Sequence, residues 1–120
     1  MSTNVLALGL DPRFADYSQM PGITPAMVQS YIDAQLERLR ALDYFVESCL
    51  VDPETAEEVT RLQLDSRTFD CVLFGAGLRA SEHLLLFEKL LNLVHERAPL
   101  AKLCFNTTPA DSAEAVQRWV

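Results

Sequence analysis

The sequence predicts an α/β domain with four parallel strands in the middle layer and helices on both faces of the sheet. Three observations carry this prediction. Short apolar runs alternate with longer helical segments four times along the 120 residues. The segments between successive runs are long enough to cross from one parallel strand to the next. Two helical segments also begin with a capping residue followed by proline, at Thr24-Pro25 and Asp52-Pro53, which is typical of a helix N-terminus.

The first half of the chain contains the clearest strand and the clearest helix. Residues 5–10 are a continuous apolar run that ends at Asp11-Pro12, as expected for a strand buried on both faces. Residues 25–42 place their apolar side chains on one half of a helix, which predicts a helix lying on a sheet. These side chains are Met27, Val28, Tyr31, Ile32, Leu36, Leu39 and Leu42.

The remaining elements follow in the same alternation. Residues 44–51 form the second strand, and the interior Glu47 places this strand at a sheet edge. The helix over 53–67 has only a thin apolar stripe, consisting of Ala56, Val59 and Leu62. Residues 69–74 and 101–105 are the third and fourth strands, and residues 81–97 form the helix between them. A short final helix carries Trp119, and nothing in the pattern divides residues 1–120 into more than one domain.

Right-handed crossovers and an edge position for the second strand favour the strand order 2-1-3-4, a flavodoxin-like or Rossmann-like arrangement without a fifth strand. In this order the chain reverses direction between the first and third strands. Ligands of open parallel sheets bind beyond the carboxyl ends of the strands at such a switch point. Two loops meet there, residues 11–24 and residues 75–80, and the first is unusually long for a connection of this kind.

Composition restricts the class of protein. Hydrophobic residues make up 49% and charged residues 22%, which is typical of a globular domain. A formal net charge of −7 argues against a nucleic-acid partner, and no apolar run is long enough to span a membrane. Cys49, Cys71 and Cys104 lie in predicted strands without metal-site spacing, so we expect reduced, buried thiols in a cytoplasmic protein.

The turn after the third strand, Gly75-Ala76-Gly77-Leu78-Arg79-Ala80, is a weak motif at an informative position, the predicted switch point. It matches the dinucleotide fingerprint G-x-G-x-x-[G/A], but it follows the third strand and no acidic residue stands about 20 positions later. Three interpretations remain. The glycines permit close backbone approach, or the turn binds a phosphate or another anion, or it binds a nucleotide cofactor. We favour the first two and expect no bound cofactor.

Several polar side chains are expected near this switch point. The ligand-binding candidates are Asp11, Arg13, Gly75, Ala76, Gly77, Arg79 and Asn106. Arg79 and backbone N–H groups suit a phosphate or carboxylate. His83 lies on the apolar side of its helix in the first turn, so it is the candidate general acid or base if the protein is an enzyme. His83 and His95 lie about 18 Å apart on a helix, which predicts no metal site.

The third helix raises the question of assembly. Its start, Leu84-Leu85-Leu86-Phe87, covers more than half of the helix circumference. Either the final helix covers these side chains or a second subunit does. The second case predicts a homodimer. The sequence therefore predicts a small domain that binds a small anionic or polar ligand at the ends of the first and third strands. A non-catalytic, homo-oligomeric interaction module is the alternative.

Overall fold

The structure, a computed structural model, describes residues 2–120 as one α/β domain. Its strands and α-helices are β1 (Thr3–Leu10), α1 (Pro25–Ala41), β2 (Tyr44–Val51), α2 (Ala56–Ser66), β3 (Cys71–Phe74), α3 (Leu84–Arg97), β4 (Lys102–Phe105) and α4 (Ser112–Gln117). Four 3₁₀ turns lie between them, namely η1 (Pro12–Phe14), η2 (Ala76–Arg79), η3 (Ser81–His83) and η4 (Pro109–Asp111).

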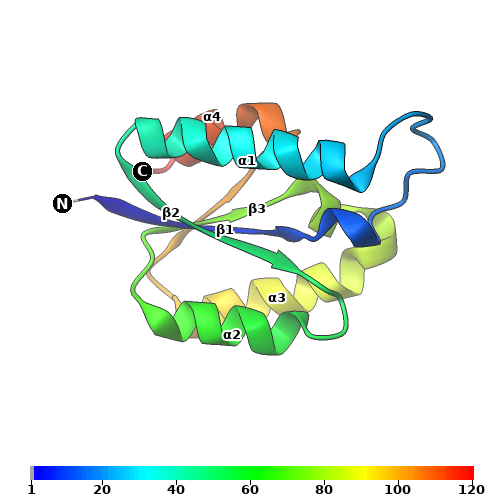
Figure 1. Cartoon of the computed structure of the whole chain (residues 1–120). Coiled ribbons are helices and arrows are strands. Elements are labelled where there is room, and N and C mark those ends of the chain that lie inside the picture. Colours follow the sequence, from blue (N-terminus) through cyan, green and yellow to red (C-terminus); the bar gives the residue numbers. More distant parts are fainter. Residues whose placement is uncertain (1) are drawn as a thin grey trace.

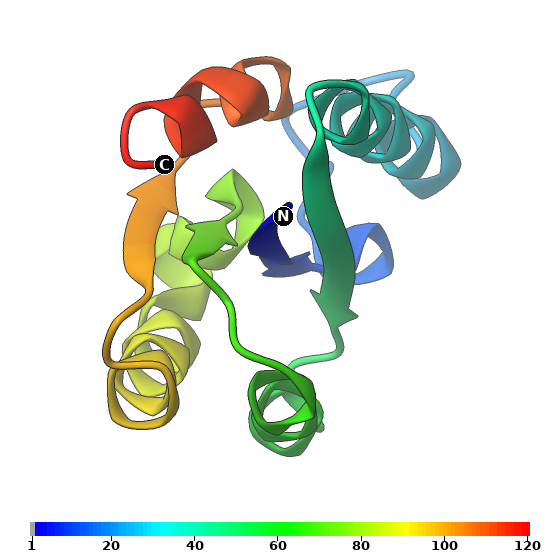
Figure 2. The same cartoon turned by 90° about the vertical axis from the view of Figure 1, so that its left-hand side faces the viewer.

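The four strands form one parallel sheet in the order β2-β1-β3-β4. This confirms the strand order and the edge position of the second strand. Figure 1 shows α1 and α4 on one face of the sheet and α2 and α3 on the other. The view along the sheet in Figure 2 separates the same three layers. Thr24 caps α1 as predicted, because its Oγ1 accepts a hydrogen bond of 3.2 Å from the Met27 amide.

Each face of the sheet has its own apolar core. Alternate residues of β1 divide between them: Leu6 and Leu8 pack toward α2 and α3, and Val5 and Ala7 pack toward α1 and α4. The final helix therefore lies on the opposite face from α3 (Figure 2). It does not cover the start of α3, where Leu85 remains 76% exposed.

Helix α2 turns a different face to the sheet than the sequence predicted. Its buried residues are Ala56, Thr60 and Leu64, whereas Leu62 is 65% exposed. The apolar stripe was misread because a threonine occupies a core position. Salt bridges to α3 also hold α2 in place. Lys89 lies 3.7 Å from Glu57, and a bridge of 3.1 Å joins Arg97 and Asp65.

The buried Thr60 hydroxyl leads to a stability prediction. Thr60 is fully buried and its Oγ1 has no hydrogen-bond partner. Valine has nearly the same shape and no unpaired oxygen, so Thr60→Val is expected to raise the free energy of unfolding by about 1 kcal/mol. Urea denaturation measures the change, and Thr60→Ser, which keeps the hydroxyl, serves as control. A destabilised valine variant would mean that the hydroxyl has a partner, with the neighbouring Cys49 thiol as the first candidate.

The three cysteines are buried and free, as predicted. Burial raises the pKa of the Cys49 thiol to about 11, so this thiol stays protonated at neutral pH. Cys71 and Cys104 lie on neighbouring strands, and their sulfur atoms are 3.2 Å apart. Along residues 2–120, no helix combines the length and the apolar character that crossing a membrane requires.

Candidate functional site

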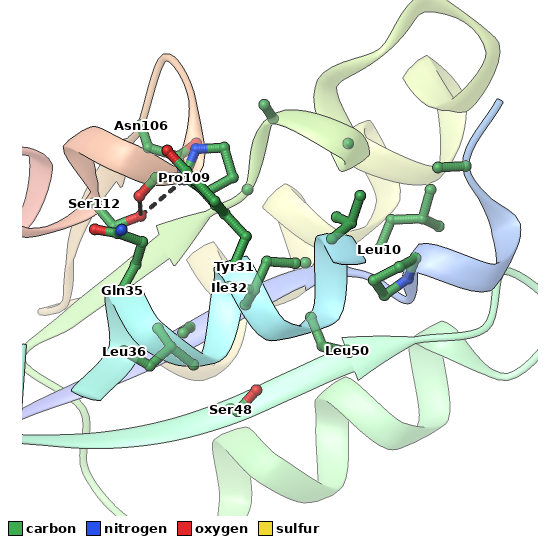
Figure 3. A pocket seen from close by; sticks show the side chains of 18 of the residues that line it. Leu10, Tyr31, Ile32, Gln35, Leu36, Ser48, Leu50, Asn106, Pro109 and Ser112 are labelled. Carbon is green, nitrogen blue, oxygen red and sulfur yellow. Dashed lines mark hydrogen bonds between the residues drawn. The ribbon is translucent and has the colours of Figure 1, made fainter. Parts of the chain in front are cut away.

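A cavity of about 520 Å³ lies between α1 and the sheet, at the carboxyl ends of β1 and β3 (Figure 3). Its floor comes from the three strands β1, β2 and β3, and its roof is the first two-thirds of α1. The loop between β1 and α1 closes one end, and the segment after β4 closes the other. Most of its lining is apolar, including Leu10, Met27, Val28, Ile32, Leu36, Leu50 and Leu73.

Small residues on the sheet create this space. Ala7, Gly9, Ser48 and Gly75 all line the floor. Because these residues have small side chains or none, a space remains between the sheet and the side chains of α1. At the other end of the helix, Leu39 is fully buried. A Cβ atom at Gly9 would stand 3.2 Å from Leu50 Cδ2, so a larger residue there requires a small shift of the Leu50 side chain. The cavity is open to solvent on one side, where the lining residues Met27 and Tyr31 are 51% and 45% exposed.

The long loop forms the apolar end of the cavity. Tyr17 lines the wall, and its hydroxyl donates a hydrogen bond of 2.6 Å to the carbonyl oxygen of Pro12. Asp11 and Arg13 turn toward each other in a salt bridge of 2.9 Å and are not part of the lining. Hydrogen bonds from Arg13 lower the pKa of Asp11. The loop thus contributes apolar surface, and its charged pair stays outside.

The opposite end of the cavity is polar. Asn106 is only 5% exposed, and its Nδ2 donates to Ser112 Oγ over 3.1 Å. Ser112 Oγ in turn donates to the Pro109 carbonyl oxygen over 2.7 Å. Gln35 approaches these residues from α1 (Figure 3), and its Oε1 is buried without a hydrogen-bond partner. We call Gln35, Asn106 and Ser112 the polar corner.

Arg79 supports this corner from behind. Its guanidinium donates to the carbonyl oxygens of Phe74 and Asn106 and lies 3.4 Å from Asn106 Oδ1. It also lies over the Phe105 ring, 5.1 Å from the ring centre. Burial lowers the pKa of Arg79, but an arginine remains charged at neutral pH. Arg79 therefore joins the ends of β3 and β4 and orients the Asn106 amide, and it does not line the cavity.

The glycine turn differs in shape from the sequence expectation. Two 3₁₀ turns, η2 and η3, separate Gly75 from α3, which begins at Leu84 and not at Ser81. A dinucleotide fingerprint requires the turn to open directly into an α-helix, and this context is missing. The glycines do allow close approach, since a Cβ atom at Gly77 would stand 3.3 Å from Leu10 Cβ. His83 ends η3, half-buried and outside the cavity lining.

Comparisons with known proteins establish the fold and nothing about the ligand. No protein-family model matches the chain, and no curated protein matches it. One similar solved structure is a "putative lipoprotein from Peptoclostridium difficile 630 (fragment)". The two share 10% sequence identity and superpose with a TM-score of 0.54, over 97% of this chain and 93% of that one. At this identity the likeness concerns the fold alone.

The structure brings part of the predicted site together. Gly75, Ala76, Gly77 and Asn106 line the cavity, and Asp11, Arg13, Arg79 and His83 do not. Roles in ligand binding stay predictions for all eight. Gln35, Ser48 and Ser112 also line the cavity and were not predicted from the sequence. The sequence does indicate that Gln35 faces the sheet, because it falls between Ile32 and Leu39 on the apolar face of α1.

Proposed function

We propose that this domain binds a small molecule with an apolar body in the cavity between α1 and the sheet. The observation that carries the proposal is an apolar space of about 520 Å³ at the switch point of a parallel sheet. Small-molecule sites have volumes of roughly 300 to 1,000 Å³, mostly apolar walls and a few polar groups. The cavity has these properties: Gln35, Asn106 and Ser112 lie together at one end, and Ser48 adds a hydroxyl on the floor.

This proposal retains the location expected from the sequence and selects between its two ligand types. The sequence predicted an anionic or a polar ligand. No charged side chain within residues 2–120 lines the cavity, and Arg79 and Arg13 are engaged by protein oxygens. We therefore favour a polar group on an apolar body over an anion. Because His83 lies outside the lining, the proposal concerns binding and assigns no reaction.

Filling the cavity from either wall tests the proposal. Ser48→Trp extends from the floor and Val28→Trp from the roof, and both are expected to abolish saturable binding of the neutral fluorophore phenylnaphthylamine. Fluorescence titration measures the binding. Ser66→Trp, on the exposed end of α2 beyond the opposite face of the sheet, is the matched control. Undiminished binding in both cavity variants, or none in the unmodified protein, would contradict the proposal.

Assembly is a second candidate function, favoured by the exposed leucines at the start of α3. Leu84 and Leu85 are 56% and 76% exposed, and α4 lies on the other face of the sheet. We infer that they form part of a homodimer interface. Sedimentation velocity is expected to find a concentration-dependent dimer, with Leu85→Glu shifting it to monomer. A monomer at all concentrations would exclude this function.

The three free cysteines are consistent with the cytoplasmic location that we also propose.

A further inference from the structure

We infer that the polar corner selects a ligand with an uncharged head that both donates and accepts a hydrogen bond, namely a hydroxyl or an amide. This inference rests on the proposed function and defines the ligand class of the same cavity. It follows from three features of the corner: an acceptor without a donor, a donor with one hydrogen to spare, and the absence of charge.

The acceptor is Gln35 Oε1. This atom is buried and has no hydrogen-bond partner, although Gln35 lies on a helix face with the apolar Ile32 and Leu39. A buried carbonyl oxygen that has lost its water is unfavourable until a donor reaches it. The side chain lies at the polar end of the cavity (Figure 3). Rotation of the Gln35 amide about its terminal side-chain bonds brings this oxygen to the cavity that Gln35 lines, where an O–H or N–H group of a ligand can satisfy it.

The donor is Asn106. Contacts on both sides fix its amide: Oδ1 faces the guanidinium of Arg79, and Nδ2 donates to Ser112 Oγ. An amide nitrogen carries two hydrogens, and the bond to Ser112 Oγ uses one of those on Asn106 Nδ2. The Ser112 hydroxyl already uses its hydrogen in the bond to the Pro109 carbonyl oxygen. The corner thus offers an acceptor at Gln35 Oε1 and amide donors at Asn106 Nδ2 and Gln35 Nε2.

Charged heads fit this corner poorly. The nearest guanidinium, that of Arg79, is separated from the cavity by Asn106 and is already shared among oxygens of Phe74 and Asn106. Arg38, one turn beyond Gln35, pairs with Glu114 at 2.6 Å. A carboxylate or an ammonium group in the corner would be buried without a counter-ion, which is strongly unfavourable. A hydroxyl meets no such penalty.

The test compares ligands that share one alkyl chain. n-Octanol, octanoate, octylamine and octane compete for the cavity at neutral pH, with displacement of phenylnaphthylamine as the measurement. We expect octanol to bind at least tenfold more tightly than octanoate or octylamine. Gln35→Leu is expected to weaken octanol about tenfold, the equivalent of one hydrogen bond, and to leave octane unchanged. Gln29→Leu is the control and is expected to change neither, because Gln29 is a half-buried glutamine of the same helix that lies outside the cavity lining and donates to Asp33.

The outcomes separate this inference from the proposed function. If neither the fluorophore nor any of the four compounds binds the unmodified protein, the cavity is not a site and both proposals fail. If the fluorophore and octane bind but octanoate or octylamine matches octanol, the site stands and the neutral-head inference is overturned. Equal loss of octanol and octane in Gln35→Leu would also overturn it, because such a loss reports a change in cavity shape.

Discussion

Phe74→Ala is expected to lower the free energy of unfolding by about 4 kcal/mol, a large part of the stability of a domain of this size. Phe74 is fully buried at the end of β3. Its ring meets those of Phe87 and Phe105 edge-on, with ring centres 5.5 and 5.8 Å away. Truncation removes these aromatic contacts and leaves a cavity where β3, β4 and α3 meet. Urea denaturation monitored by circular dichroism measures the loss.

A pair of controls separates the aromatic contacts from the loss of volume. Phe74→Leu fills most of the space without an aromatic ring. It is expected to recover more than half of the stability that Phe74→Ala loses. In a double-mutant cycle, Phe74→Ala and Phe87→Ala are expected to be non-additive, because the two rings touch. A loss below about 1.5 kcal/mol in Phe74→Ala would mean that the core relaxes around the missing ring. Strict additivity in the cycle would show that the two rings are not energetically coupled.

The fold was predictable from local signals that agree with one another. The strand at residues 5–10 is apolar throughout, the Thr24-Pro25 cap marks the start of α1, and Glu47 indicates an edge strand. Parallel order then follows from right-handed crossovers. The prediction was wrong about the buried face of α2, where a threonine stands at a core position. Thr60 is buried in α2 and Leu62 is exposed, because contacts with the sheet and α3 decide which face of the helix is buried.

The position of the cavity was predictable, but the character of its lining was not. Strand order alone predicts a crevice beside Gly75, and the cavity lies there. The character of the cavity depends on which side chains on separate elements are small. Ala7, Gly9 and Ser48 come from two strands, and only their shared position under α1 leaves space. The partners of a charged side chain depend on the same tertiary arrangement, as Arg79 illustrates.

Arg79→Met is expected to lower the free energy of unfolding by about 2 to 3 kcal/mol with no anion added. Methionine keeps much of the apolar stem, but it removes the guanidinium that lies over the Phe105 ring and donates to the Phe74 and Asn106 carbonyl oxygens. Hydrogen bonds from charged donors contribute about 1.5 to 3 kcal/mol. Arg79→Lys is expected to recover only a small part, because one ammonium group does not span these oxygens as a planar guanidinium does.

The same variant decides between the structural role of Arg79 and the anion-binding role predicted from the sequence. If Arg79 holds the strand ends together, thermal unfolding of the methionine variant shows the full loss in a buffer without phosphate or carboxylate. Adding phosphate then changes the melting temperatures of both proteins equally. If Arg79 instead binds an anion, the two proteins have similar stability in the absence of phosphate, and phosphate stabilises only the unmodified protein. The contacts of Arg79 with Phe74 and Asn106 favour the first result, since a guanidinium already shared between buried carbonyl oxygens has few donors left for an anion.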